Sequence, residues 1–150
     1  LRIFGAITPA VEQELKSKWN STSTLSILDN QPFETILKEM RKCDVFVLPT
    51  HTEGFPNVIL ESMACGCAIV TTPVGAIPEM LEDEDGKHYG IMVEPRNVNQ
   101  LKSAIEKMLS DEEFKAQCRI NVQQRVNERY NIESVWHKMV EMWHRTISNS

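Results

Sequence analysis

The chain has 150 residues, of which 41% are hydrophobic and 25% charged, a composition typical of soluble globular domains rather than of disordered or fibrous proteins. Its formal net charge of −5 argues against a general nucleic-acid-binding protein, which would carry a basic face. No apolar run reaches the ~18 residues that a membrane-spanning helix needs. The chain opens at Leu1 on a strand-like run, without a signal-peptide pattern. We therefore expect residues 1–150 to form a single domain, cut from a longer protein.

Strand-like and helix-like segments alternate from the first residues onward. Short apolar runs predict strands at residues 1–5, 24–28, 44–48, 68–71 and 90–93. Apolar residues at helical spacing predict helices at residues 9–19, 32–42, 56–66, 75–81 and 98–109. Pro9 suits a first helical turn, and Gly66 is expected to end its helix. Strands separated by helices indicate parallel pairing through right-handed crossovers. The predicted fold class is α/β, a Rossmann-like doubly wound parallel sheet with helices on both faces.

The C-terminal third of the chain is expected to be helical throughout, as a helical tail. Ser110-Asp111-Glu112-Glu113 predicts a capped helix start with acids in the first turn. A last helix, residues 132–147, carries four apolar residues on one stripe: Trp136, Val140, Trp143 and Ile147. Such a stripe either packs against the helix's own domain or forms an exposed patch built for another domain.

The four cysteines are Cys43, Cys65, Cys67 and Cys118. Cys65-Gly66-Cys67 has the form of a ligand pair, but no second pair or well-spaced histidine completes a zinc site. We therefore expect no metal site, and free thiols in a reducing compartment. Cys43 and Cys65 are expected to be small core residues.

The most informative segment is the loop and helix start Glu53-Gly54-Phe55-Pro56-Asn57-Val58-Ile59-Leu60-Glu61, which follows a buried strand-like run. Ligands of open α/β sheets bind at the carboxyl ends of the strands. Glu53 in the loop and Glu61 in the second helical turn can therefore face one crevice. The alternatives are a solvated helix acid for Glu61 and an ordinary loop acid for Glu53. His51 of the same loop either touches a ligand or is a surface residue.

Three runs together resemble a known family: residues 44–50, residues 53–66 and residues 74–79, Val-Gly-Ala-Ile-Pro-Glu. They are similar to the C-terminal donor-binding domain of retaining family-four (group 1) glycosyltransferases, which have the GT-B fold. That family carries a Glu-x7-Glu motif, and Glu53 and Glu61 have this spacing. The resemblance continues through residues 90–95 and covers nearly the whole chain. Ala68 and Ala76 depart from the family pattern, where proline and glycine are common, and neither change rules out binding.

The resemblance implies a role for each acid. Glu61 would hydrogen-bond the ribose hydroxyls of a nucleoside diphosphate, and Glu53, the catalytic-site residue of this set, would contact the hydroxyls of the transferred sugar. A carboxylate offers two acceptor oxygens, which suits a vicinal diol. The remaining donor-binding residues are expected to supply main-chain N–H groups, close approach and a preset helical turn: Gly54, Phe55, Pro56, Asn57, Val58 and Gly75. No cofactor and no metal is expected beyond the nucleotide-sugar substrate.

The cations of a phosphate site are missing from the central part of the sequence. No Lys or Arg occurs between Lys42 and Lys87, so the motif would meet a diphosphate with main-chain dipoles alone. In the family, an Arg and a Lys from a glycine-rich segment before the first strand contact the phosphates. An N-terminal domain binds the acceptor there. Both are expected to precede this chain, which alone is expected to be inactive.

The resemblance thus implies the donor half of a retaining glycosyltransferase. It would move a hexose-type sugar from a nucleoside diphosphate, with UDP expected, to a saccharide or lipid-linked acceptor in polysaccharide biosynthesis. The expected location is the cytoplasm, with peripheral association at the inner membrane face left open. Two alternatives stay open: a GT-B sugar-nucleotide epimerase, and a non-catalytic interaction module of the same fold. An epimerase would form a product isomer without acceptor, and an interaction module would not bind a donor through Glu61.

Overall fold

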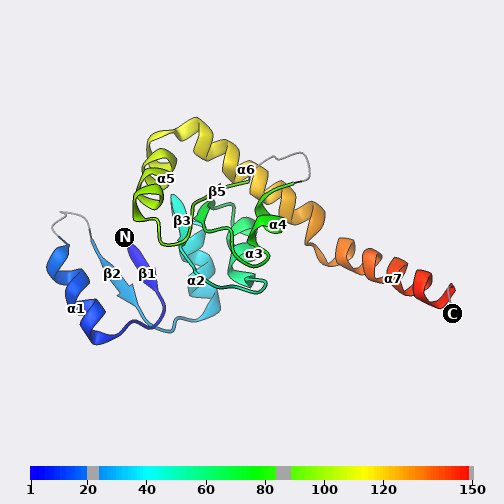
Figure 1. Cartoon of the computed structure of the whole chain (residues 1–150), viewed down its shortest axis with the longest axis horizontal. Helices are drawn as coiled ribbons and strands as arrows, with labels where there is room; N and C mark the ends of the chain where they lie inside the picture. The colour runs from blue at the N-terminus through cyan, green and yellow to red at the C-terminus, as the bar shows by residue number, and fades with distance from the viewer. Residues whose placement is uncertain (20–23, 84–88, 149–150) are drawn as a thin grey trace. The chain divides into compact units, whose positions relative to one another are not determined.

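The structure is a computed structural model that describes residues 1–19, 24–83 and 89–148 (Figure 1). Its contacts divide the chain into two compact units, Leu1–Lys38 (unit 1) and Glu39–Ser150 (unit 2), and each is described by itself. The prediction that residues 1–150 form a single domain stays a prediction.

Unit 1 is a β–α–β segment built from β1 (Arg2–Phe4), α1 (Pro9–Lys18) and β2 (Ser26–Leu28). The two strands pair in parallel, with Ile3 opposite Ile27. α1 begins as predicted, with Pro9 in its first turn and the Thr8 hydroxyl accepting from the Val11 N–H at 3.4 Å. A further helix, α2 (Phe33–Met40), runs on into unit 2, where Met40 is buried.

Unit 2 contains a parallel sheet in the order β3-β4-β5. Its strands are β3 (Val45–Leu48), β4 (Ala68–Thr71) and β5 (Ile91–Met92). Its remaining helices are α3 (Asn57–Ala64), α4 (Ile77–Leu81), α5 (Val98–Ser110), α6 (Glu112–Arg129) and α7 (Ile132–Ser148). The central strand β4 is buried along its whole length, in agreement with the apolar run that precedes its last residue, Thr71.

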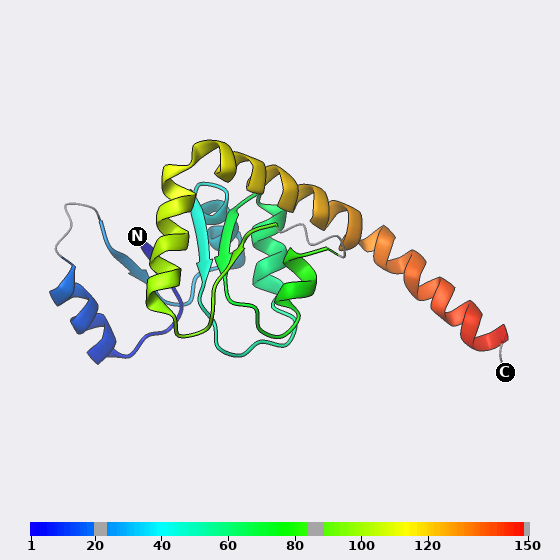
Figure 2. The same ribbon diagram turned by 45° about the horizontal axis from the view of Figure 1, so that its top comes forward.

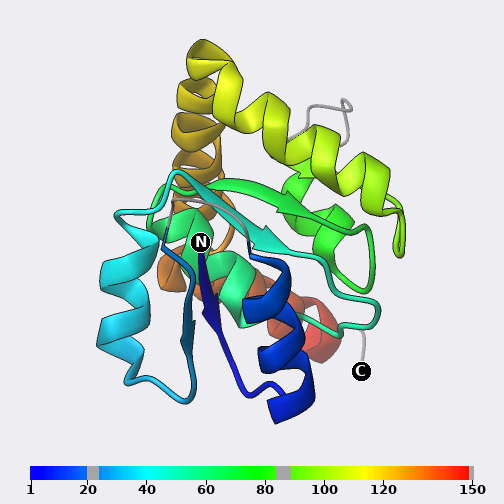
Figure 3. The same cartoon turned by 90° about the vertical axis from the view of Figure 1, so that its left-hand side faces the viewer.

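Helices cover both faces of this sheet (Figures 2 and 3). Ala68 and Val70 of β4 pack with Ala104 and Met108 of α5 on one face. α3 lies on the other face, where its Ile59 and Met63 are fully buried. All five predicted strands are therefore present, the pairing is parallel within each hydrogen-bonded set, and helices alternate with the strands along the chain. The α/β prediction of a doubly wound parallel fold is confirmed, with the described strands hydrogen-bonded as two sets, β1-β2 and β3-β4-β5.

Two helix boundaries follow the local signals in the sequence. Gly66 has a φ of +70°, and its N–H donates to the Met63 carbonyl while the Cys67 N–H donates to the Ser62 carbonyl, both at 3.0 Å. This is the Schellman end expected of a glycine at the close of a helix, and it delivers the chain directly into β4. The start of α6 is capped by Asp111, whose carboxylate accepts from the Phe114 N–H at 3.0 Å.

The apolar stripe on α7 is exposed rather than packed against the helix's own domain. Trp136 is 54% exposed and Trp143 is 49% exposed. The two rings contact each other edge to face, with centroids 6.1 Å apart. Figures 1 and 2 show α7 leading away from the sheet of unit 2. Of the two interpretations of this stripe, the exposed patch is the one that the structure supports. None of the helices in the described ranges is long and apolar enough to cross a membrane.

All four cysteines are free thiols, but their burial differs from the prediction. Cys67 and Cys118 are buried, whereas Cys43 and Cys65 are only half-buried, so the prediction that Cys43 and Cys65 are core residues is wrong. Cys67 takes that place because it leads into the fully buried strand β4. No three His, Cys, Asp or Glu side chains in the part of the chain that is described are grouped so as to hold a metal ion. That the protein needs no metal ion stays a prediction.

Candidate functional site

Two loops meet at the carboxyl ends of neighbouring strands. We call residues 49–56, after β3, the motif loop, and residues 73–76, after β4, the glycine loop. The Ala76 N–H donates to the Gly54 carbonyl at 2.9 Å. Gly75 has a φ of +58°, and a Cβ on it would lie 2.3 Å from the Glu53 carbonyl oxygen and 2.7 Å from that of Gly54. Only glycine fits there, so the predicted donor-site residue Gly75 holds the two loops in direct contact.

Two buried threonines at the end of β4 fix the same junction. The Thr71 hydroxyl donates to the Leu48 carbonyl at 2.8 Å, and the Thr72 hydroxyl donates to the Thr50 carbonyl at 2.5 Å. Buried hydroxyls need acceptors, and these two find theirs on the strand end and loop of β3. Sequence reasoning missed them. The signal that was present is a Thr-Thr pair closing an otherwise apolar buried strand.

The two motif acids, Glu53 and Glu61, are both half-buried. Glu53 lies in the motif loop against the glycine loop, and Glu61 lies in the second turn of α3, as the sequence predicted. Within the described residues, neither carboxylate forms a hydrogen bond or an ion pair. Each therefore keeps its acceptor oxygens for water or for a ligand.

The rest of the predicted donor set lies between these acids. Pro56 is buried and immediately precedes α3, so the helix begins at Asn57, one residue later than predicted. Asn57 and Val58 are the first two residues of α3, where N–H groups have no intrahelical acceptor. A Cβ on Gly54 would meet nothing within 4 Å. Phe55 is 50% exposed, and its ring lies 6.2 Å from that of Tyr130.

A buried arginine on α6 supports the helix that follows the glycine loop. Arg125 is 4% exposed, and its guanidinium donates to the carbonyls of Glu79 and Met80 at 2.8 Å each and to that of Glu82. The Tyr130 hydroxyl also donates to the Glu79 carbonyl, at 3.2 Å, and burial raises the pKa of that phenol. Sequence reasoning missed both residues. The available signal is that Arg125 stands at helical spacing with buried Val122.

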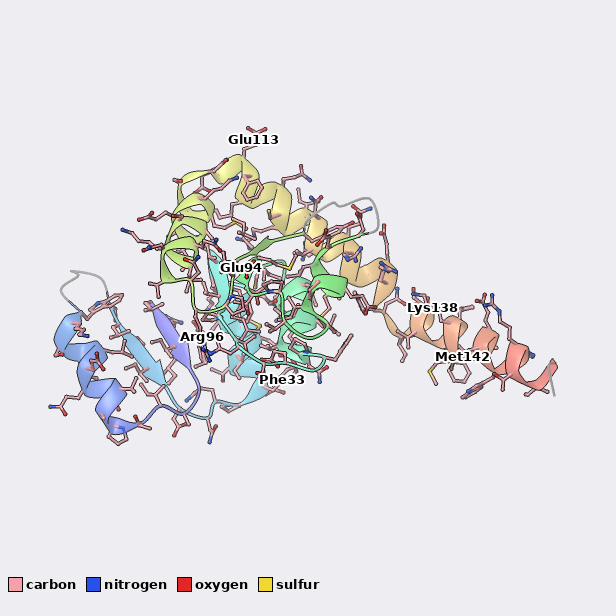
Figure 4. The ribbon with its side chains drawn as sticks, viewed as in Figure 1. Phe33, Glu94, Arg96, Glu113, Lys138 and Met142 are labelled. Atoms are coloured by element: carbon pink, nitrogen blue, oxygen red, sulfur yellow. The ribbon has the colours of Figure 1, made fainter. Side chains whose placement is uncertain are left out.

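A cavity of about 240 Å³ lies at the carboxyl ends of β3, β4 and β5 and shares Pro49 and His51 with the motif loop. Its lining comes from the segments that follow β3, β4 and β5 and from the start of α5: Pro49, His51, Thr72, Val93, Glu94, Arg96, Asn97, Val98 and Leu101. Glu53 and Glu61 are not among these residues. Figure 4 labels Glu94 and Arg96 in the loop after β5. Arg96 is thus a cation at the strand ends that sequence reasoning did not single out. A larger, shallower cavity of about 620 Å³ lies over β5 and α5 and does not include the motif loop.

Comparison with known proteins defines the family. The sequence model described as glycosyl transferases group 1 matches residues 1–111, which is more than half of the chain. The chain therefore belongs to the group 1 glycosyl transferases, and the resemblance stated from its motifs is confirmed.

Two relatives and one solved structure illustrate the similarity. The capsular polysaccharide biosynthesis glycosyltransferase CapM of Staphylococcus aureus is 32% identical over 108 residues, covering 71% of this chain and 27% of that protein. The N-acetylgalactosamine-N,N'-diacetylbacillosaminyl-diphospho-undecaprenol 4-alpha-N-acetylgalactosaminyltransferase of Campylobacter jejuni is 35% identical over 88 residues, covering 58% of this chain and 22% of that protein. HepE of Anabaena, solved in complex with UDP-glucose, has a TM-score of 0.77 at 21% identity, covering 96% of this chain and 40% of that chain.

These matches differ in what they establish. The structural similarity to HepE shows the fold, that of the GT-B glycosyltransferases. The chain spans about a quarter of the length of the curated relatives it matches, 27% of one and 22% of the other. The activity of a whole protein that contains this chain is therefore a matter for proposal.

Proposed function

We propose that the chain is the donor-binding part of a retaining glycosyltransferase. It binds a nucleoside diphosphate sugar, with UDP as the nucleotide, and supports transfer of a hexose-type sugar to a saccharide or lipid-linked acceptor. Membership of group 1 supports the reaction class. Two similar proteins support the substrates: HepE was solved with UDP-glucose, and the Campylobacter relative is named for a diphospho-undecaprenol acceptor. A lipid-linked acceptor also favours a location of the enzyme in the cytoplasm, at the inner face of the membrane.

The observation that carries the proposal is the junction of the motif loop with the glycine loop. It supports a site because two partly desolvated carboxylates, Glu53 and Glu61, flank a rigid turn without a partner among the described residues. Shielding an ionised carboxylate from water costs free energy unless hydrogen-bond donors replace that water. The hydroxyls of a sugar and a ribose are donors of that kind.

The proposed division of roles follows from the positions along α3. Glu61 accepts from the ribose hydroxyls, and Glu53 accepts from the hydroxyls of the transferred sugar. The diphosphate approaches over Gly54, where no side chain is in the way, and meets the N–H groups at the start of α3, Asn57 and Val58. A helix N-terminus stabilises negative charge even where no cation is present. Phe55 and Pro56 hold this backbone in place, Phe55 through its contact with Tyr130.

Calorimetric titration with UDP, GDP and ADP tests the donor site. We expect UDP to bind and Glu61→Gln to weaken it about 10- to 150-fold, the equivalent of a hydrogen bond to a charged group worth about 1.5–3 kcal/mol. Glu61→Gln keeps the size of the side chain, so the variant is expected to fold like the parent chain. Glu113→Gln is the matched control, because Glu113 is an exposed acid at the start of α6, well away from both loops in Figure 4.

Three outcomes decide the matter. UDP binding that is weakened by Glu61→Gln and not by Glu113→Gln supports the proposal. Preference for GDP or ADP would correct the nucleotide and leave the site in place. Absence of binding by all three nucleotides at millimolar concentration would contradict a donor site in this chain and favour an interaction module of the same fold.

A further inference from the structure

Two cysteine thiols meet at the amino ends of neighbouring strands. Cys43 lies two residues before β3, and Cys67 immediately precedes β4. These strands pair in parallel with Val45 opposite Ala68, so their first residues lie side by side. The sheet therefore brings the two thiols together at the end opposite to the motif loop and the glycine loop. The proposed donor site uses neither of them.

The geometry of this pair is close to that of a disulfide. The sulfur atoms of Cys43 and Cys67 lie 3.7 Å apart, and they lie 3.1 and 3.2 Å from the Met40 carbonyl oxygen. A disulfide bond is about 2.05 Å long, so the two sulfur atoms must approach each other by roughly 1.7 Å. Small rotations of the two side chains supply a movement of this size. The spacing of adjacent strands, about 4.8 Å, also suits the roughly 4.4–6.8 Å that separates the Cα atoms of bonded cysteines.

The two thiols differ in exposure and in acidity. Cys43 is half-buried, whereas Cys67 is fully buried. The contact with Cys67 lowers the pKa of Cys43, and the charge of Arg119 on α6 adds to this, against burial and the charge of Asp44. The same contact, together with burial, raises the pKa of Cys67. Because the thiolate is the reactive form, Cys43 is the thiol that a small reagent from solvent meets first, and Cys67 is the one that follows.

We propose that Cys43 and Cys67 form an oxidation site, at which a hydroperoxide closes a reversible disulfide between the ends of β3 and β4. With hydrogen peroxide, the Cys43 thiolate attacks one peroxide oxygen, the O–O bond breaks, and the leaving hydroxide takes up a proton to become water. The Cys67 sulfur then attacks the sulfur of the resulting Cys43 sulfenic acid. The S–O bond breaks, and the hydroxyl leaves as a second water with the proton of the Cys67 thiol. Two thiols and one hydrogen peroxide thus give one disulfide and two waters.

The disulfide encloses the segment that carries the donor motif. The two cysteines are 24 positions apart, and the residues between them include the motif loop and α3, with Glu53 and Glu61. A covalent link across this span restricts the unfolded chain and so stabilises the folded one. In a reducing compartment the thiols are the resting form, and the disulfide forms on exposure to peroxide. The oxidation site stands on the geometry of the thiols and is independent of the proposed transferase function.

Peptide mapping after oxidation tests the site. The folded chain is treated with equimolar hydrogen peroxide, the remaining thiols are blocked with N-ethylmaleimide, and the chain is digested without reductant. Trypsin has no cleavage site between Cys43 and Cys67, so it leaves both on one peptide. A protease that cuts after glutamate separates them, because Glu53 and Glu61 lie between. Fragment spectra then assign the bond to Cys67 or to its neighbour Cys65.

Three chains give the comparison. We expect a Cys43–Cys67 link in the parent chain and in Cys65→Ser, the matched control, which removes the other half-buried thiol of this segment. Cys43→Ser is expected to fold, because the side chain is only half-buried, and to form no link. A link from Cys43 to Cys65, a link between two copies of the chain, or oxidation of Cys43 to sulfinic acid without any link would overturn the proposal.

Thermal unfolding followed by circular dichroism measures the consequence of the link. We expect the oxidised parent chain to unfold at a temperature about 5 °C or more above that of the reduced chain, and dithiothreitol to reverse the shift. The same peroxide treatment should leave the midpoint of Cys43→Ser unchanged. A linked chain that unfolds at the same temperature as the reduced chain, or below it, would mean that the sulfur atoms join only by straining the strand ends, and the stabilising role would be wrong.

Discussion

The buried guanidinium of Arg125 gives the sharpest test of how unit 2 is held together. It donates to three main-chain carbonyls at and just after the end of α4, two of them at 2.8 Å. It also lies over the Tyr89 ring, 4.6 Å from the centroid. The last carbonyls of a helix lack intrahelical partners, and a planar fork of N–H groups can satisfy several of them at once. Arg125→Ala removes all of these contacts. The Glu79 carbonyl keeps the Tyr130 hydroxyl as a donor, and the Met80 and Glu82 carbonyls are left to whatever water can reach them.

The size of the effect follows from those contacts. A hydrogen bond to a charged group contributes about 1.5–3 kcal/mol, and the three bonds are not additive because they share one side chain. The contact with Tyr89 adds about 0.5–2 kcal/mol. We therefore expect Arg125→Ala to lower the free energy of unfolding by about 3–5 kcal/mol, out of roughly 5–15 kcal/mol for a domain. At about 2–4 °C per kcal/mol for a chain of this size, the midpoint of thermal unfolding falls by roughly 6–20 °C.

Urea denaturation followed by circular dichroism measures this change, with two companion variants. Arg125→Lys keeps the charge but loses the planar fork, so its loss should be smaller but clearly measurable. Arg145→Ala removes an exposed arginine from α7 and should change the free energy of unfolding by less than about 0.5 kcal/mol. A loss below about 1 kcal/mol for Arg125→Ala would refute the claim that the end of α4 depends on this side chain.

Two further predictions concern the loop junction and the thiols. Gly75→Ala should lower the free energy of unfolding by more than about 2 kcal/mol and abolish UDP binding, because the new Cβ would lie 2.3 Å from the Glu53 carbonyl oxygen. Gly54→Ala should change the free energy of unfolding by less than about 0.5 kcal/mol and weaken only UDP binding. Equal losses of stability for the two variants in urea denaturation would contradict this reasoning. The thiols of Cys43 and Cys67 are hydrogen-bonded, with their sulfur atoms 3.7 Å apart, and this contact lowers the pKa of Cys43, whereas burial raises the pKa of Cys65. The thiolate of Cys43 therefore forms at lower pH, and its alkylation by iodoacetamide, followed by peptide mass spectrometry, should set in at lower pH than that of Cys65. Cys67→Ala should move the Cys43 profile to higher pH, and an unchanged profile would rule out Cys67 as the cause.

Features with local causes were predictable from the sequence. The five strands are short apolar runs, and the helix ends at Thr8, Gly66 and Asp111 depend on residues within one turn of the boundary. The position of Glu61 in the second turn of α3 follows from the same local spacing. A pattern in the chain is sufficient where the interaction joins residues a few positions apart.

Features that join distant segments were not predictable in this way. Arg125 meets carbonyls 43 to 46 positions earlier in the chain, and the Thr72 hydroxyl meets a carbonyl 22 positions earlier. The partner in each case is a main-chain oxygen, which every residue carries, so no residue type marks it in the sequence. The packing partner of the exposed stripe on α7 could not be predicted either. The apolar residues of the stripe have the same spacing whether the helix packs against its own domain or against another domain.

The two glycines of the loop junction differ in what requires them. Gly75 is required by the chain itself, through its positive φ and the carbonyl oxygens that a Cβ would meet. Gly54 has open space where a Cβ would stand, and it serves the fold through its carbonyl, which any residue could supply. The fold therefore gives a reason for Gly75 and none for Gly54. The proposed donor, which would approach the backbone of the motif loop between Glu53 and the start of α3, would supply that reason. For this reason Gly54→Ala is expected to separate binding from stability more cleanly than a change at either acid.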